Sequence, residues 1–247
     1  MLTTNTSEAM AEANVLDKGY VRMLEFMGGD AGVLLAARVS FAQGLKTEAK
    51  DKKLIFYLLQ HNHMTPFEHA VFKFHVKCPI FVMRQWIRHR MASYNEWSLR
   101  YSETPEEFYV PAEMRIQDTK NKQGSLEAAG KLDQKAALAQ YKDAIELSFK
   151  TYRSFIDQGV AREMARMVLP TALYTQFYWT INARSLMNFI LLRAEAHAQW
   201  ETQVYAQAIA AMFKEKMPWT WEAFLRFVWK GGNPILDAEK SQLIDVK

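Results

Sequence analysis

The sequence predicts an α+β fold in which a small, mostly antiparallel sheet packs with several long helices. The hydrophobic pattern switches repeatedly between a period of two, typical of strands, and a period of 3.6, typical of helices. It lacks the regular alternation of strand and helix that marks a doubly wound parallel sheet. The 247 residues, 49% of them hydrophobic, can bury a core in one compact unit. We therefore expect one α+β domain over residues 14–230, with a flexible tail at 1–13 and a C-terminal tail at 231–247.

The first elements are predicted to be a hairpin and two helices. The turn sequence Asp17-Lys18-Gly19 precedes a run of alternating side chains, which predicts a β-hairpin. Asp30 is placed to cap a helix that runs to about Arg38. Apolar residues at helical spacing predict a second helix, from about Thr47 to the polar break at His61-Asn62-His63.

A strand and a short helix are predicted next. Apolar and polar side chains alternate over residues 70–78, which indicates a half-buried strand. On this strand His75 falls on the face expected to meet solvent, and Cys78 falls on the apolar face. Pro79 suits the first position of a helix, which we expect over residues 80 to about 89.

The second half of the chain is predicted to be mostly helical. In order we expect a short strand at 106–111, a variable loop at 119–132, an amphipathic helix at 134–157, a short helix at 162–168, a strand at 177–180 and helices up to 216. A break is expected near His197. The aromatic cluster from Trp219 to Trp229 is interpreted as packing in the C-terminal region.

The composition excludes several classes of protein. A single cysteine, Cys78, rules out an internal disulfide framework and indicates a reducing compartment. The longest uncharged stretch, residues 167–183, contains many polar side chains, so we expect no membrane span. A net charge of +4 is too mild for a partner such as a nucleic acid polymer. No glycine-rich nucleotide loop or serine elbow is present, and we expect a cytoplasmic protein.

The densest group of chemically active side chains lies at residues 84–101, with the sequence RQWIRHRMASYNEWSLRY. It holds four arginines and one acidic residue, Glu96. Arginine binds phosphate or carboxylate through a planar fork, which indicates a site of fixed geometry. We expect Gln85 and Arg88 to be neighbours on a helix and the segment from Arg90 to Arg100 to be a loop. The alternative is a surface loop stabilised by Arg–Glu pairs.

The order of these residues resembles the signature of flavin-dependent thymidylate synthases. Arg88-His89-Arg90 is followed by seven residues and then Ser98, within the pattern Arg-His-Arg-x-x-Ser-x-Asn-Glu-x-Ser-x-Arg-Tyr. Matching motifs occur at residues 63–69, 162–170, 182–189 and 192–201, in the same order as in the family. The resemblance covers about residues 15–230.

The resemblance implies a homotetrameric enzyme of nucleotide synthesis. It would convert dUMP to dTMP with methylenetetrahydrofolate as carbon donor and NADPH as reductant, through bound FAD. The residues matching the family's cofactor site are His63, Thr65, Arg88, His89, Arg90, Glu96, Asn182, Ala183, Arg184 and Asn188. Those matching or lying within its substrate-binding segments are Gln85, Trp86, Ile87, Arg88, Glu96, Trp97, Ser98, Leu99, Arg100, Arg166 and Arg193. Trp97 and Leu99 fall at unspecified positions of the signature.

The resemblance also assigns a catalytic role to Arg193. A catalytic thiol should be exposed, whereas Cys78 is expected to be buried, which leaves cofactor chemistry and electrostatic activation. A fixed positive charge at Arg193 would stabilise negative charge that develops on the pyrimidine ring. The alternative is an ion pair with Glu195 or Glu201.

Helix geometry adds an expectation about assembly. Arg184 and Asn188 are four residues apart and share a helix face, whereas Arg193 is nine residues beyond Arg184 and falls on roughly the opposite side. One helix would then not present all three residues to one pocket. We therefore expect the FAD and dUMP sites to be assembled from more than one chain.

Two other functions remain open from the residues alone. One is a nucleotide- or small-RNA-binding module, in which the arginines hold phosphates without chemistry. The other is a metal-assisted phosphohydrolase. Its metal would have to use the histidines near Glu68, but their spacing is not that of a known ligand set, and we expect no metal.

Overall fold

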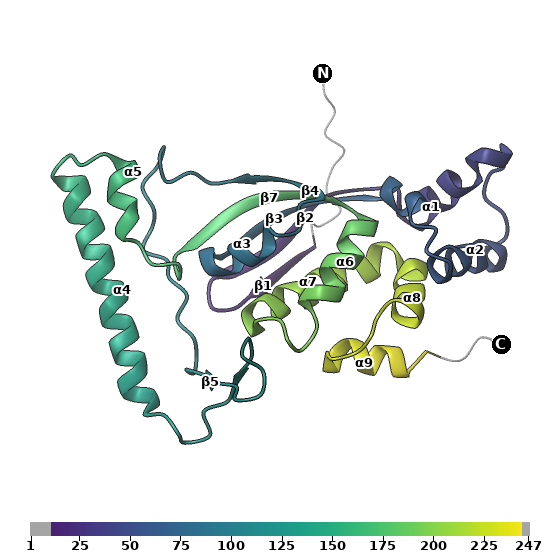
Figure 1. Cartoon of the computed structure of the whole chain (residues 1–247). Helices are drawn as coiled ribbons and strands as arrows, with labels where there is room; N and C mark the ends of the chain where they lie inside the picture. Colours follow the sequence, from purple (N-terminus) through teal and green to yellow (C-terminus); the bar gives the residue numbers. More distant parts are fainter. Residues whose placement is uncertain (1–10, 244–247) are drawn as a thin grey trace.

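The computed structural model describes residues 11–243, apart from the side chain of Phe41. Its central feature is a five-stranded antiparallel sheet (Figure 1). In spatial order the strands are β1 (Glu12–Val15), β2 (Gly19–Met27), β3 (Val71–Pro79), β7 (Tyr174–Asn182) and β4 (Ala92–Glu96). This arrangement confirms the predicted α+β class and antiparallel sheet.

One face of the sheet carries the main core. On β3 the side chains of Phe72, Phe74 and Val76 are fully buried, and so is Cys78, as predicted. The helices packed on the sheet are α3 (Ile80–Trp86), α6 (Ala183–Arg193) and α7 (Trp200–Lys216). The alternation of β3 therefore directs its apolar side chains toward these helices.

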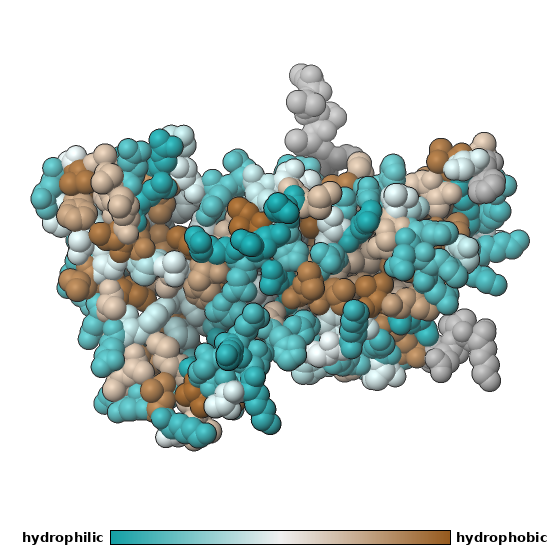
Figure 2. All heavy atoms as spheres, viewed as in Figure 1, coloured by the Kyte–Doolittle hydropathy of each residue, from teal (hydrophilic) through white to brown (hydrophobic). Residues whose placement is uncertain are grey.

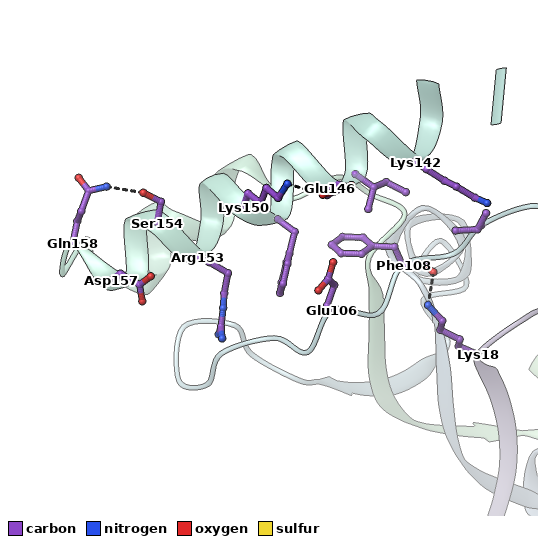
Figure 3. Close-up of a pocket in the computed structure, with 13 residues that line it drawn as sticks. Lys18, Glu106, Phe108, Lys142, Glu146, Lys150, Arg153, Ser154, Asp157 and Gln158 are labelled. Atoms are coloured by element: carbon purple, nitrogen blue, oxygen red, sulfur yellow. Dashed lines mark hydrogen bonds and ion pairs between the residues drawn. The ribbon is translucent and has the colours of Figure 1, made fainter. Parts of the chain in front are cut away.

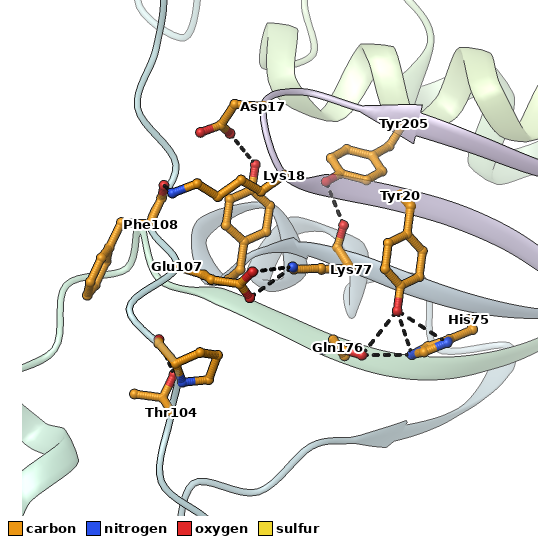
Figure 4. A network of polar contacts seen from close by, with 12 residues as sticks. Asp17, Lys18, Tyr20, His75, Lys77, Thr104, Glu107, Phe108, Gln176 and Tyr205 are labelled. Atoms are coloured by element: carbon orange, nitrogen blue, oxygen red, sulfur yellow. Dashed lines mark hydrogen bonds and ion pairs between the residues drawn. The ribbon is translucent and has the colours of Figure 1, made fainter.

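The other face of the sheet is polar and partly covered by aromatic rings. His75 was expected to face solvent, but its ring is half-buried beside Tyr20 and Tyr178, and it hydrogen-bonds to Gln176 Oε1 at 3.1 Å (Figure 4). Burial lowers the pKa of His75, so the side chain lies on the expected polar face but meets solvent only in part. The ring is covered by neighbours from β2 and β7, which the sequence of β3 alone does not reveal.

The helices at one end of the molecule are α1 (Gly29–Arg38), α2 (Glu48–Gln60), α8 (Pro218–Phe227) and α9 (Pro234–Ser241), with short 3₁₀ turns at Val39–Phe41 and Thr65–His69 (Figure 1). Asp30 was expected to cap α1. Instead its carboxylate accepts the backbone N–H groups of Trp219 and Thr220 at 2.9 and 3.1 Å, together with the Thr220 hydroxyl. Asp30 therefore caps α8, a helix 188 residues further along the chain.

At the opposite end α4 (Gln134–Asp157) stands apart from the sheet as an arm, with α5 (Arg162–Ala165) and the 3₁₀ turn Arg166–Val168 beside it (Figure 1). The predicted bounds of α4 are confirmed. The small hairpin of β5 (Ile116–Gln117) and β6 (Ser125–Leu126) lies between the arm and the body. Within residues 11–243, none of the helices combines the length and apolar character that spanning a bilayer requires.

Polar contacts attach the segment before the arm to the sheet. Lys77 Nζ lies 2.9 Å from the carboxylate of Glu107, and Lys18 Nζ donates to the carbonyl of Phe108 at 3.2 Å (Figure 4). The Tyr205 hydroxyl donates to the carbonyl of Lys77 at 2.7 Å and connects the same strand to α7. These contacts position the chain that leads away from the arginine signature.

Several predicted boundaries are wrong. Strand β1 begins inside the expected tail 1–13, and α9 lies inside the expected tail 231–247; residues 1–10 and 244–247 lie outside the described part. Pro79 ends β3 and caps α3 instead of occupying its first position, and α3 ends at Trp86. The expected strand 106–111 is reduced to one bridge between Phe108 and Leu173.

The segment expected to be a loop from Arg90 to Arg100 contains β4. This strand pairs with β7 from Ala92 opposite Ile181 to Glu96 opposite Phe177. Its polar composition hides the strand because β4 lies at the edge of the sheet and only part of it contributes to the core.

Candidate active site

A cavity of about 820 Å³ opens where β7 ends and α6 begins, beside the end of α3. Its lining includes six residues predicted for the cofactor site and the predicted catalytic arginine: Arg88, His89, Arg90, Asn182, Arg184, Asn188 and Arg193. These residues come from two segments of the chain that lie about 100 positions apart. The fold therefore brings the two main motifs of the sequence to one site.

The junction of β7 and α6 positions one wall of the cavity. Asn182 Oδ1 accepts the backbone N–H of Ser185 at 2.9 Å and so caps α6. The next residue, Ala183, is fully buried, and its N–H donates to the carbonyl of Ala70 at 2.8 Å. Ala183 thus fixes the start of α6 through packing and its backbone, whereas Arg184 and Asn188 extend from exposed positions of this helix.

Arg193 and His89 form a hydrogen-bonded pair. Arg193 Nε donates to His89 Nε2 at 2.9 Å, and its Nη2 donates to the carbonyl of Gln85 at 3.3 Å. Burial and then the charge of Arg193 lower the pKa of His89 to about 4. His89 is therefore neutral near pH 7, with Nε2 acting as the acceptor. Burial, and then the neighbouring charge of Arg88, lower the pKa of Arg193.

The alternative interpretation of Arg193 does not hold for the described residues. Arg193 forms no ion pair with Glu195 or Glu201 there, and Glu201 pairs with Arg115 at 2.7 Å. Arg184 and Arg193 line the same cavity, so the expectation that one helix could not present both is wrong. The cavity reaches the C-terminal end of α6, where the long Arg193 side chain turns toward α3.

The second half of the signature lies elsewhere. Glu96 lies four positions along an extended strand from Ala92, a distance of about 13 Å. Glu96 Oε1 accepts the Thr175 hydroxyl at 2.7 Å. Glu96 and Trp97 line a separate hollow of about 370 Å³ on the polar face of the sheet. Glu96 is thus not gathered with the other predicted cofactor residues.

The remaining residues at the end of the signature follow β4 away from the cavity. The Trp97 indole donates to Ser102 Oγ at 2.6 Å, and Leu99 packs on a second, smaller core beneath the arm. Arg100 lies 3.5 Å from Glu163 of α5, close in sequence to the exposed Arg166. Together with Ser98 they form a second group of predicted substrate residues.

The other substrate candidates have mixed surroundings. Trp86 is fully buried in the main core, and its neighbour Ile87 is exposed. Gln85 is half-buried, and its side-chain amide donates to Gln199 Oε1. Trp86 is therefore a packing residue that supports the end of α3, from which Arg88 and His89 reach the cavity.

His63 and Thr65 flank the cavity without being among its lining residues. Both are exposed, and Met64 between them does line it. The His63 ring lies 5.7 Å from the ring of Tyr57 on α2. The 3₁₀ turn that follows also supplies Glu68, which pairs with Arg184 at 2.6 Å.

A cavity of similar size, about 840 Å³, lies between α4 and the segment around Glu106 and Phe108 (Figure 3). It contains none of the predicted site residues. Charges of both signs line it, and Lys150 pairs with Glu146 on the same helix. It therefore lacks the concentrated positive charge of the first cavity.

Comparison with known proteins identifies the family. The family model for thymidylate synthase complementing proteins matches residues 22–219. A flavin-dependent thymidylate synthase of Thermosipho africanus is 56% identical over 220 residues, which cover 89% of this chain and 96% of the relative. The chain belongs to the flavin-dependent thymidylate synthase family. A flavin-dependent thymidylate synthase from Thermus thermophilus is 50% identical, and the match covers 88% of this chain and 79% of the length of that relative.

A solved structure is similar to this chain in both fold and sequence. The crystal structure of a UMP/dUMP methylase, PolB from Streptomyces cacaoi, bound with 5-Br dUMP, superposes with a TM-score of 0.79. It is 33% identical in sequence, and the match covers 87% of this chain and 98% of that one.

The single thiol of the chain is not accessible. Cys78, the single cysteine of the chain, is fully buried, and burial raises its pKa well above the usual value. It cannot act as an exposed thiolate nucleophile. Among the described residues, no three His, Cys, Asp or Glu side chains are grouped so as to hold a metal ion.

Sequence reasoning missed some residues of the cavity. Met64 and Glu68 lie inside a motif that was recognised, but only His63 and Thr65 of that motif were assigned to the site. Ser185 was missed although it sits three residues after Asn182, the spacing of a capping pair. The ion pair of Glu68 with Arg184 is a tertiary contact, and the sequence contains no local signal for it.

Proposed function

We propose that the protein converts dUMP to dTMP as an FAD-dependent thymidylate synthase, with methylenetetrahydrofolate as carbon donor and NADPH as reductant. The observation that carries this proposal is the cavity in which three arginines from two separate motifs meet the Arg193–His89 pair. The sole thiol is buried, so activation of the pyrimidine falls to charge and cofactor chemistry.

The chemistry of the cavity fits FAD. Its pyrophosphate carries two negative charges, and Arg88, Arg90 and Arg184 supply cations with the geometry that suits phosphate. Asn182 and Asn188 supply amide groups that can bind the heterocycles. Bound FAD would supply the redox chemistry, while these residues hold and orient it.

Arg193 would act on the substrate. Its guanidinium is held from two sides, by His89 and by the carbonyl of Gln85. A pre-oriented cation stabilises negative charge that develops on the pyrimidine without reorganising during the reaction. The pyrimidine of dUMP would then lie beside Arg193, with its phosphate reaching residues of the second group.

We further propose that a homotetramer completes the site. Ser98 and Arg100 follow β4 and do not line the cavity that contains Arg193 of the same chain. A second chain would therefore supply these two residues to the site. Large apolar side chains are exposed beside both groups: Met91 and Tyr101 are more than three-quarters exposed, and Met167 is 70% exposed. Figure 2 shows apolar patches on the arm and across the middle of the body, as expected for surfaces that pack in an assembly.

Titration of the purified protein with FAD and then dUMP, followed by visible absorption, tests the proposal. We expect a saturable flavin spectrum that shifts when dUMP is added, because both ligands would share one site. Arg88→Ala should weaken FAD binding, whereas Lys135→Glu on the arm should not. Absence of saturable flavin binding would favour the nucleotide- or RNA-binding module instead.

A further inference from the structure

A positively charged groove adjoins the cavity and has no role in the site described so far. It runs between α2 and α8, has a volume of about 860 Å³, and we call it the α2–α8 groove. Its main lining residues are Lys52, Lys53, Phe56, Tyr57, Phe227 and Lys240. The helices α2 and α8 lie at the end of the molecule opposite the arm helix α4 (Figure 1).

Among the described residues, four cationic side chains and no acidic one line the groove. Lys52 pairs with Glu222 at 2.6 Å, and Arg226, which also lines the groove, pairs with the same carboxylate at 3.0 Å. Lys53 is exposed and forms no ion pair with any residue in the range 11–243. Lys240 donates to the carbonyl of Trp229, a neutral acceptor. The groove is therefore an electrostatically favourable site for an anion.

Aromatic side chains also line the groove. Lys52 Nζ lies 5.6 Å from the centre of the Phe56 ring, and the Arg226 guanidinium lies 5.8 Å from it. Phe227 packs edge-on against the same ring at 5.8 Å, and Tyr57 is half exposed. A surface of cations held on aromatic rings suits an anionic organic molecule better than a bare inorganic ion.

The linings of the groove and the cavity come close to each other at two places. Tyr57 lines the groove and contacts the ring of His63, whose neighbour Met64 lines the cavity. Phe227 lines the groove, and the next residue, Val228, lines the cavity. The groove and the cavity are therefore neighbours, which is the arrangement that one extended ligand would need.

We propose that the α2–α8 groove binds the anionic end of a co-substrate, an inference that rests on the proposed function. Both co-substrates carry anionic groups on a flexible chain far from the reacting ring: a 2′-phosphate in NADPH and glutamate carboxylates in methylenetetrahydrofolate. Lysine suits such groups because its ammonium is a mobile point charge that does not require a fixed bidentate geometry.

Calorimetric titration of the FAD-loaded protein tests this inference. The variant Lys53→Glu reverses a charge in the groove without touching a residue assigned to the active site. The probes are NADP⁺, NAD⁺, folic acid and folyl-triglutamate. We expect Lys53→Glu to raise the Kd of the probe that uses the groove about fivefold at low ionic strength, and less at high salt. Lys135→Glu, the same charge change on the exposed surface of α4, should leave every Kd unchanged.

Each result has a distinct meaning. A loss for NADP⁺ but not for NAD⁺ assigns the groove to the phosphate, and a loss for folyl-triglutamate that exceeds the loss for folic acid assigns it to the carboxylates. Equal Kd values for wild type and Lys53→Glu with all four probes would overturn the inference, as would an equal loss in Lys135→Glu. A wild-type protein that binds neither FAD nor dUMP would instead contradict the proposed function.

Discussion

Arg193 owes its orientation to a neutral histidine. His89 accepts a hydrogen bond from Arg193 because burial keeps its ring unprotonated, and the carbonyl of Gln85 accepts a second one. The guanidinium therefore stays charged and directed without a carboxylate beside it that would weaken its effect on a substrate. Neutral acceptors thus orient the guanidinium of Arg193 without neutralising its charge.

Replacement of Arg193 by Ala should leave FAD bound but reduce dTMP formation at least about a hundredfold, because a transition-state charge interaction contributes several kcal/mol. The flavin spectrum and the rate of dTMP formation measure the two effects separately. Arg193→Lys retains the charge but loses the second hydrogen bond, and should be intermediate. Turnover close to wild type in Arg193→Ala would remove the proposed role.

His89 should make the folded state sensitive to moderate acid. Its pKa is about 4 when folded and near 6.5 when unfolded, so the unfolded chain binds the extra proton between these values. Stability should therefore fall as the pH is lowered from about 6.5 toward 4. His89→Gln keeps an acceptor but does not titrate, so its Tm should fall less over this range. Parallel Tm curves for the two proteins would contradict the assignment.

The environment of a single residue could be predicted where neighbours in the sequence determine it, and could not where distant segments do. Burial of Cys78 follows from the alternation of β3 alone, and the structure confirms it. The contacts of His75 and Asp30 depend on partners more than 100 residues away, Gln176 and Thr220 respectively. No periodicity encodes such pairings, which is why the expected role of Asp30 was wrong and the rings that partly cover His75 were not predicted.

Asp30 stabilises the molecule at the level of elements, because it connects the start of α1 to the start of α8. Three donors converge on its largely buried carboxylate, two of them backbone groups that α8 itself cannot satisfy. Asp30→Ala should cost about 2–4 kcal/mol of unfolding free energy, because buried donors lose their acceptor.

Thermal or urea unfolding measures this loss. Thr220→Val provides the control, since it removes only the hydroxyl donor and should cost less. If Asp30→Ala unfolds at the wild-type midpoint, the two helices are held together by apolar packing alone.

Long elements with a complete pattern were predicted well, and short polar ones were not. The bounds of α4 follow from an uninterrupted amphipathic pattern that begins after the capping residue Asp133. Strand β4 has no such pattern and exists because the edge of β7 offers it hydrogen-bonding partners. The motifs themselves were recognised, but the edge strand that separates them could be seen only in three dimensions.

At the scale of the whole molecule, the separation of Arg193 from Arg100 leads to a test of assembly. Arg193→Ala and Arg100→Ala should each be nearly inactive. If one chain supplies Arg193 and another supplies Arg100 to each site, mixed assemblies contain some sites with both residues intact. Random mixing of equal amounts should restore about a quarter of the wild-type activity.

Refolding the two variants together and measuring dTMP formation decides the matter, with each variant refolded alone as the control. Persistent inactivity of the mixture, in assemblies shown by mass to contain both variants, would mean that each site is built within one chain. The mass in solution provides an independent check, since a fully active monomer would exclude a shared site.

The pairing of β4 with β7 also constrains how the signature can vary in length. Successive side chains of a strand point to opposite faces, so one residue inserted within β4 would reverse the orientation of the side chains that follow it in the strand. Two inserted residues would restore the orientation but displace Ser98 by about 7 Å. The seven residues between the two halves of the signature therefore act as a fixed spacer, whose length matters more than its side chains.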